Sequence, residues 1–211
     1  MENKTLPIYA LVIDPKDDTG VDFVALVDNP AIEKGWMAFS EQKEQKFITT
    51  NQERRIVTGA LMIPDLPIYR KDEQLGEYYV FFSKDTIWQI IQKYFKNGFT
   101  SNVNMMHDSN MIAKGVYMVE SFQVDKTRGI ASPSCLGNLP QGTWVGTFKV
   151  DNEEIWNEYV KTGVFRGFSV EGIFQHKYLV DKSQDQTEAV AERILNMREQ
   201  LKNLKNFMYK Q

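Results

Sequence analysis

Three short segments of the sequence carry side chains that could do chemistry. The first is residues 104–108 (NMMHD), which place His107, one of two histidines in the chain, among apolar residues and before a turn. Histidine titrates near neutral pH, so it can accept a proton from a nucleophile and return it later. A histidine in a surface loop would fit the same residues, so this segment alone leaves both interpretations open.

The second segment, residues 165–172 (FRGFSVEG), places Ser169 between aromatic and aliphatic neighbours. Gly167 and Gly172 flank the serine, and glycines let a backbone approach a substrate closely. Amides in such a segment can stabilise an oxyanion. The pattern differs from the Gly-x-Ser-x-Gly elbow, which needs a strand followed by a helix. A serine that faces solvent from a strand is the alternative interpretation.

The third segment, residues 20–32, places Asp22 inside an otherwise apolar strand. An unpaired buried carboxylate is costly, so Asp22 needs a partner if its side chain points inward, and a histidine would satisfy it. An aspartate on an edge strand that points to water is the alternative.

No metal or cofactor site is predicted. The chain has two histidines, His107 and His176, and one cysteine, Cys135, and none of the usual zinc or EF-hand spacings. The glycines of residues 163–168 follow a predicted helix and precede a predicted strand, which is the reverse of a phosphate-binding loop.

The composition is that of an ordinary globular protein. The 211 residues are 42% hydrophobic and 25% charged, which is enough for a sizeable core. The net charge of −3 argues against a nucleic-acid-binding protein. No apolar run reaches the ~18 residues of a membrane span, and one cysteine cannot form an internal disulfide. We therefore expect a soluble intracellular protein that does not contact membrane or nucleic acid.

The hydrophobic pattern predicts a mixture of strands and helices. Strands are expected near residues 8–13, 21–27, 56–62, 78–82, 113–124, 144–150 and 168–174. The clearest helix covers residues 87–95, with Ser83 as its N-cap and Gly98 as its stop. A second helix is expected at residues 151–161, with a capping box of Asp151 and Glu154.

The C-terminal segment has a different pattern. Residues 181–186 are polar and resemble a linker. Apolar residues then recur at alternating spacings of four and three, which is the seam of a coiled coil or of a docking helix; they are Val190, Ile194, Met197, Leu201, Leu204 and Met208. This pattern predicts an amphipathic helix that self-associates through residues 187–208, or one that packs on its own domain.

Taken together, the segments resemble the phage prohead (capsid-maturation) serine protease superfamily, in particular its XkdF-like branch. The family's histidine motif is matched by residues 105–108 and the Gly-Val strand after it by residues 114–116. Its following strand, helix and Gly-x-Ser strand are matched by residues 143–150, 153–161 and 166–172. One segment departs from the family order: residues 24–31 precede the histidine, whereas many relatives have a similar segment after the serine, so the strand order looks circularly permuted.

The resemblance implies an α+β fold like that of the herpesvirus proteases, a small and mostly antiparallel β-barrel flanked by helices. Residues 1–180 would form the protease-like domain, and residues 181–211 the linker and the amphipathic helix. A permuted strand can fill the same place in such a fold, because chain termini are often close together.

The resemblance also implies roles for individual residues. Ser169 would be the nucleophile and His107 the base, with Arg166 and Gly167 beside the oxyanion site. Asp22 is our choice for the third member, since it lies in the strand that matches the family. The other contenders are Asp28, Glu120 and His176.

The implied activity is that of a prohead maturation endopeptidase. Its substrates would be the phage scaffold, the major capsid protein and the protease itself, cut inside the assembling prohead in the host cytoplasm. The protein would be encoded by a phage or by a prophage. A non-catalytic capsid structural or cargo protein on the same fold is the main alternative. A cysteine hydrolase that uses Cys135 with His107 is a weaker one.

Overall fold

A computed structural model of the chain describes residues 6–28 and 46–178. These residues form three four-stranded sheets and few helices. The first sheet has the order β12-β1-β6-β5, with bounds Gln175–Tyr178, Ile8–Val12, Gly76–Phe82 and Ile68–Asp72. The second has the order β3-β4-β10-β9, with bounds Ile48–Asn51, Ile56–Met62, Trp144–Val150 and Val116–Gln123. The third has the order β11-β2-β7-β8, with bounds Gly167–Ile173, Gly20–Val27, Val103–Met105 and Asp108–Ile112.

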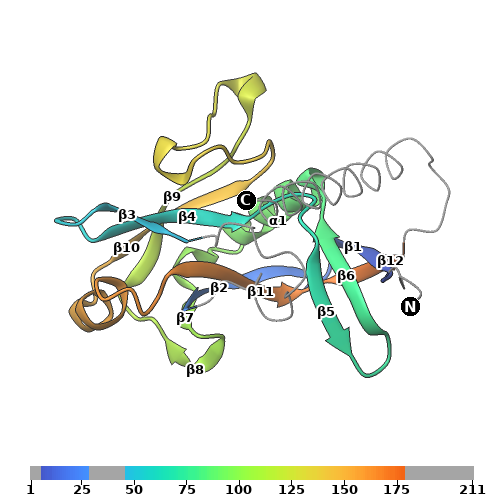
Figure 1. Cartoon of the computed structure of the whole chain (residues 1–211), viewed down its shortest axis with the longest axis horizontal. Helices are drawn as coiled ribbons and strands as arrows, with labels where there is room; N and C mark the ends of the chain where they lie inside the picture. The colour runs from blue at the N-terminus through green and yellow to red at the C-terminus, as the bar shows by residue number, and fades with distance from the viewer. Residues whose placement is uncertain (1–5, 29–45, 179–211) are drawn as a thin grey trace, which may run out of the picture.

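The structure agrees with the predicted α+β class, but its sheets are not closed into the predicted β-barrel. Each of the three sheets is open and has two edge strands. In Figure 1, β11 and β2 cross the middle of the view below β4 and β10, and the β5–β6 hairpin lies to one side. The sheets are therefore not closed into a barrel, although a single bridge between Lys46 and Gly167 joins the segment before β3 to the edge strand β11.

The predicted first helix is confirmed as α1, Lys84–Lys96. The Ser83 hydroxyl accepts a hydrogen bond from the backbone N–H of Thr86, which is the expected N-cap. Gly98 follows the helix with φ of 72°, a conformation that suits glycine. The periodic isoleucines of α1 are buried, so the spacing of apolar residues correctly identified the face that packs on the sheets.

The predicted second helix is a short, wide π-helical turn, η4, Ile155–Val160. Its first turn is capped by Asn152, whose Oδ1 accepts a hydrogen bond from the backbone N–H of Ile155. The expected cap, Asp151, instead accepts a hydrogen bond from the Tyr117 hydroxyl and pairs with Lys149. The shorter turn is then continued by a loop into the serine strand β11. Three single 3₁₀ turns, η1 (Phe99–Ser101), η2 (Lys126–Arg128) and η3 (Ser134–Leu136), complete the helical elements.

The two N-terminal apolar runs form strands as predicted, but they belong to different sheets. β1 pairs with β6 and β12, whereas β2 pairs with β11 and β7. The loop between them is tied to α1 by Lys93, whose ammonium group donates to the backbone carbonyls of Asp14, Asp17 and Thr19. This anchoring fixes the point at which the chain crosses from one sheet to the other.

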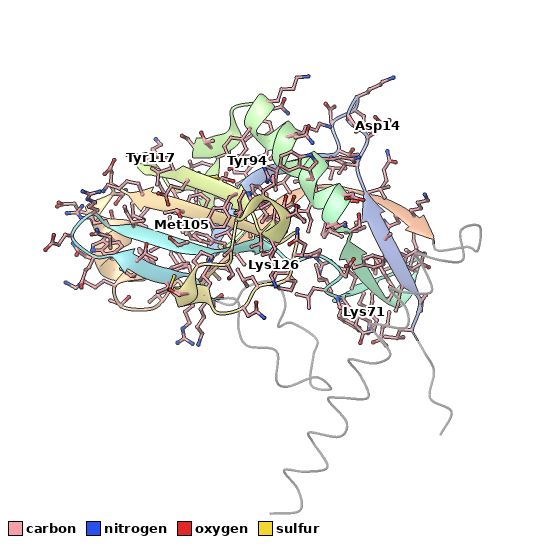
Figure 2. The ribbon with its side chains drawn as sticks, turned by 90° about the horizontal axis from the view of Figure 1, so that it is seen from above. Asp14, Lys71, Tyr94, Met105, Tyr117 and Lys126 are labelled. Carbon is pink, nitrogen blue, oxygen red and sulfur yellow. The ribbon has the colours of Figure 1, made fainter. Side chains whose placement is uncertain are left out.

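The core lies between α1 and the sheets. Tyr94 of α1 and Trp144 of β10 are fully buried, with their ring centroids 5.3 Å apart. Figure 2, which looks down on α1, shows Tyr94 where the helix meets the sheets. Within residues 6–28 and 46–178, no helix is long and apolar enough to cross a bilayer. The predicted linker at 181–186 and the amphipathic helix at 187–208 lie outside the described residues.

Candidate active site

The N-terminal strand β2 lies between the strand that carries Ser169 and the strand that leads to His107. β11 pairs antiparallel with β2, and β2 pairs parallel with β7. In this register Ser169 is opposite Ala25, and Ala25 is opposite Asn104, so these three side chains share one face of the sheet. Glu171 is two residues beyond Ser169 and points to the same face. The small side chain of Ala25 leaves room above β2 for longer side chains from both neighbours.

His107 lies in a tight turn whose backbone is strained. β7 and β8 form a hairpin in which Met105 is opposite Asp108, so the turn consists of Met106 and His107. These two residues have φ values of 57° and 60°, as in a type I′ turn, where asparagine and glycine are preferred. Strain of this kind gathers at functional sites, because the fold holds a side chain where the site needs it. Here it holds the imidazole over β2.

The imidazole of His107 contacts a carboxylate. His107 Nδ1 lies 3.0 Å from Glu171 Oε1, and both side chains are partly exposed. The same oxygen accepts a hydrogen bond of 2.6 Å from Asn104 Nδ2, and Asn104 is buried. Because a carboxylate can only accept, His107 carries its proton on Nδ1 and leaves Nε2 free to take another. The Oδ1 atom of Asn104 has no hydrogen-bond partner among the described residues.

Ser169, His107 and Glu171 all line one cavity of about 610 Å³. Ser169 is only 4% exposed, so it does not lie on an open strand surface, and it lines this cavity. The opposite wall is formed by β4, β5 and β6 and is largely apolar, with Leu61, Val80 and Phe82 among its side chains. A mostly apolar cleft with a few convergent polar groups is the usual form of a ligand or substrate site.

Gly172 is required where β11 crosses β2. A Cβ atom at this position would lie 1.8 Å from the carbonyl oxygen of Gly20, far closer than any real contact. The register of the two strands also shifts between Glu171 and Gly172, which is a β-bulge. Bulges re-aim side chains next to active sites. Gly172 thus lets the backbones meet here, whereas the sequence suggested that it leaves space for a substrate.

The structure does not bring Asp22 to this cavity. Asp22 lies on β2 three positions from Ala25, so it points to the opposite face, and its side chain is exposed. The carboxylate that contacts His107 is Glu171. Neither Asp28 nor Glu120 lines the cavity, and Glu120 is exposed on β9. His176 does line the cavity, where its ring packs edge-on against Tyr78 with centroids 5.7 Å apart.

Two other candidate positions lie away from the cavity. Arg166 is exposed, and its side chain donates a hydrogen bond to the carbonyl of Gly163. Gly167 forms an isolated bridge with Lys46, and neither Arg166 nor Gly167 lines the cavity. Cys135 is exposed in η3 and also does not line it. Within the ranges 6–28 and 46–178, no group of three or more His, Cys, Asp or Glu side chains is placed to hold a metal ion.

A buried serine that lines the same cavity as an imidazole–carboxylate pair provides the residue types of a serine hydrolase site. Residues 44–177, more than half of the chain, match the family described as "Putative phage serine protease XkdF", and the chain belongs to this family. No curated protein and no solved structure matches the chain, so the likeness to herpesvirus proteases stays a prediction. The matched range begins after β2, so the strand between Ser169 and Asn104 comes from outside it.

Sequence reasoning missed Glu171 and Asn104 as members of the site. Both residues lie in the two segments that were singled out for Ser169 and His107. The signal for Glu171 was its spacing of two from Ser169, because residues i and i+2 of a strand share a face. For Asn104 the sequence held no comparable signal, since its role depends on how β7 pairs with β2.

Proposed function

We propose that the protein is a serine endopeptidase in which Ser169 is the nucleophile, His107 the general base and Glu171 the residue that orients His107. The contact of 3.0 Å between His107 Nδ1 and Glu171, on the wall of the cavity that holds Ser169, is the observation that carries this proposal. Family membership supports it at the level of a phage serine protease. Glu171 takes the role for which the sequence suggested Asp22.

The proposed reaction is acyl transfer. Ser169 Oγ attacks a peptide carbonyl while His107 Nε2 takes the hydroxyl proton, and the same nitrogen then protonates the leaving amine. Glu171 holds the Nδ1–H tautomer of His107 and stabilises the imidazolium that forms. Water then hydrolyses the acyl-enzyme, with His107 again as the base.

Backbone N–H groups of β11 are our candidates for stabilising the oxyanion. β11 is an edge strand of its sheet, so alternate N–H groups point away from β2. Donors that are fixed before the reaction stabilise developing charge without reorganisation. This replaces the suggestion from sequence that Arg166 and Gly167 border that site.

We place this activity in capsid maturation, with the phage scaffold and the major capsid protein as substrates. The cleavage would take place inside the assembling prohead, in the host cytoplasm. Residues 187–208, with their apolar seam, would mediate self-association or docking to the scaffold. Family membership and the sequence pattern of this segment support these proposals.

Intact mass over time tests the activity. The full chain is incubated alone and with its cognate scaffold, beside Ser169→Ala and, as a matched control, Ser101→Ala, an exposed serine of η1. We expect fragments with the parent chain and with Ser101→Ala, and none with Ser169→Ala. A fluorophosphonate probe should label the same two proteins at Ser169. If neither cleavage nor labelling depends on Ser169, the chain is a capsid structural protein on a protease-like fold.

Alkylation of Cys135 separates the cysteine hydrolase alternative. Cys135 is exposed, so iodoacetamide reaches it in the folded protein. We expect cleavage to continue at an unchanged rate after complete alkylation, verified by mass. Loss of cleavage on alkylation would point to Cys135 in place of Ser169.

A further inference from the structure

The cavity has a second polar end, formed by one face of the sheet β12-β1-β6-β5. Arg70 of β5 is opposite Tyr78 of β6, and the ring of His176 on β12 packs against the same tyrosine. All three side chains line the cavity that holds Ser169. Ser169 and His176 are seven residues apart along the continuous segment from β11 to β12, so the two ends are separated by up to roughly 20 Å.

Arg70 has no acidic partner at this end. Its Nη1 donates a hydrogen bond of 3.0 Å to the carbonyl of Tyr69, and no carboxylate forms an ion pair with it within residues 6–28 and 46–178. Arg70 is an exposed residue of β5, and burial of part of its side chain against the cavity wall lowers its pKa. Arginine nevertheless stays protonated at neutral pH. A cation in this situation favours an anion brought by a ligand.

The carboxylates nearest to the cavity are already engaged. Glu171 accepts from Asn104 and contacts His107 at the other end. Asp72 shares a face with Arg70, but its carboxylate accepts from the backbone N–H groups of Gln74 and Leu75. These hydrogen bonds, with that of Leu75 first, and the Tyr78 hydroxyl lower the pKa of Asp72. Burial in turn raises the pKa of Tyr78. Asp72 also interacts electrostatically with His176, so it partly compensates charge at this end, but Arg70 forms no ion pair with it among the described residues.

The surface between the two ends is apolar, with Leu66, Val80, Phe82 and Phe174 among its side chains. We propose that this cavity binds a peptide whose apolar side chains cover the middle and whose Asp or Glu side chain pairs with Arg70 and His176. The guanidinium fork suits a carboxylate, which it binds through two parallel hydrogen bonds. The proposal rests on the proposed function, because it makes this end a specificity subsite of the same protease.

Binding is measured without cleavage, using Ser169→Ala. The probes are two fluorescein-labelled peptide pools with blocked ends, in which Leu, Ala and either Glu or Gln are mixed at random. We expect the Glu pool to bind roughly 2- to 5-fold more tightly, the range of an ion pair with an exposed arginine. Arg70→Gln should abolish this preference and Arg70→Lys should reduce it, because lysine lacks the planar fork.

Lys71→Gln is the matched control. Lys71 is the next residue on β5, so it points to the other face, where it pairs with Glu77, and its substitution removes the same charge. We expect Lys71→Gln to keep the preference for Glu. Equal affinity for the two pools, or equal effects of Arg70→Gln and Lys71→Gln, would overturn the proposal. A Gln pool with free C-terminal carboxylates tests the other source of the anion, and preferential binding of that pool alone would also overturn it.

A cleavage arm locates the subsite relative to the cut bond. The active chain is incubated with an end-blocked random peptide library, and the products are sequenced by mass spectrometry. We expect Asp and Glu to be enriched at one fixed position in the products of the parent chain and of Lys71→Gln, but not in those of Arg70→Gln. Cleavage without this enrichment would refute the proposed subsite but would still support the proposed protease activity. Preferential binding without any cleavage would refute the protease and leave an acidic-peptide site.

Discussion

Two buried polar atoms without a hydrogen-bond partner among the described residues lie in contrasting parts of the molecule. The Tyr94 hydroxyl lies in the core beneath α1, where aromatic rings surround it. The Oδ1 atom of Asn104 lies beside the cavity, and the other side-chain atom of that residue holds Glu171. An unpaired buried polar atom costs roughly 1–3 kcal/mol in either place. Only Asn104 belongs to a connected set of polar groups, which also includes Glu171 and His107.

The region around Asn104 combines several features that the fold does not need for stability. His107 has a left-handed backbone, Ser169 is a buried hydroxyl, and Asn104 is fully buried beside a carboxylate. The core under α1 has one isolated hydroxyl in otherwise apolar packing. The difference teaches that several destabilising features gathered in one place, such as strained backbone and buried polar groups, indicate a functional site. A single buried polar group without a partner indicates imperfect packing. The predictions below separate stability from activity in the two regions.

Replacing His107 with glycine should give the largest effect. Glycine adopts the positive φ of the turn without strain, so we expect His107→Gly to raise the free energy of unfolding by about 0.5–1 kcal/mol. Cleavage should fall by roughly 10⁴-fold or more, because the general base is lost. Met106→Gly relieves the same strain at the neighbouring position and should keep full activity. Thermal unfolding and cleavage rates measure the two effects, and a stable, active His107→Gly protein would contradict the site.

Replacing Glu171 with glutamine should lower cleavage by roughly 10²- to 10⁴-fold, because a neutral amide no longer fixes the Nδ1–H tautomer of His107. Stability should change little, since the carbonyl oxygen of the new amide can still accept from Asn104. Glu120→Gln is the control, because Glu120 is an exposed strand carboxylate away from the cavity. Equal rates for Glu171→Gln and the parent chain would show that His107 does not act with this carboxylate.

The local parts of this structure could be predicted from the sequence, because they depend on neighbouring residues. The cap at Ser83 and the apolar spacing of α1 are examples. Ser169 and His107 were selected by the resemblance of their segments to the family, and the structure places both on one cavity. The partner of His107 could not be found in this way. It is set by the pairing of β2 with β11 and β7, and a shift of one residue there would exchange the faces of every side chain.

Asp22 shows why the argument from burial left two interpretations open. A carboxylate in an apolar strand needs a partner only if it faces the interior, and the sequence does not say whether a strand position near its end is covered. Asp22 lies near the start of β2 and is exposed. The arrangement of the sheets could not be predicted for a similar reason, because whether strands close into a barrel depends on contacts between distant segments.

Truncating the core under α1 should affect stability without affecting the chemistry. Ile90 is fully buried, so Ile90→Ala should lower the free energy of unfolding by about 2–5 kcal/mol through lost burial and the cavity that remains. Gln89→Ala, on the exposed side of the same helix, should change it by less than about 0.5 kcal/mol. Cleavage per folded molecule should be unchanged in both. Denaturant unfolding with activity measured below the transition checks this, and a large loss of specific activity in Ile90→Ala would mean that the two regions are coupled.

Replacing Tyr94 with phenylalanine should give the smallest effect. Whether it raises or lowers the free energy of unfolding shows whether the hydroxyl has a partner. Removing an unpaired buried hydroxyl while keeping the ring is neutral or stabilising, so we expect a gain of up to about 1 kcal/mol and no change in cleavage. Burial also raises the pKa of Tyr94 well above the ordinary tyrosine value of about 10. Above about pH 10, the ordinary tyrosine pKa, Tyr94 loses its proton in the unfolded chain but keeps it in the folded chain. The parent protein is therefore progressively destabilised, whereas Tyr94→Phe is not. The advantage of Tyr94→Phe should therefore grow in unfolding experiments between pH 9 and pH 11 (about one unit on either side of that value). A loss of stability in Tyr94→Phe at neutral pH would show that the hydroxyl does have a partner. Tyr94 would then no longer be an isolated unpaired group with which Asn104 can be contrasted.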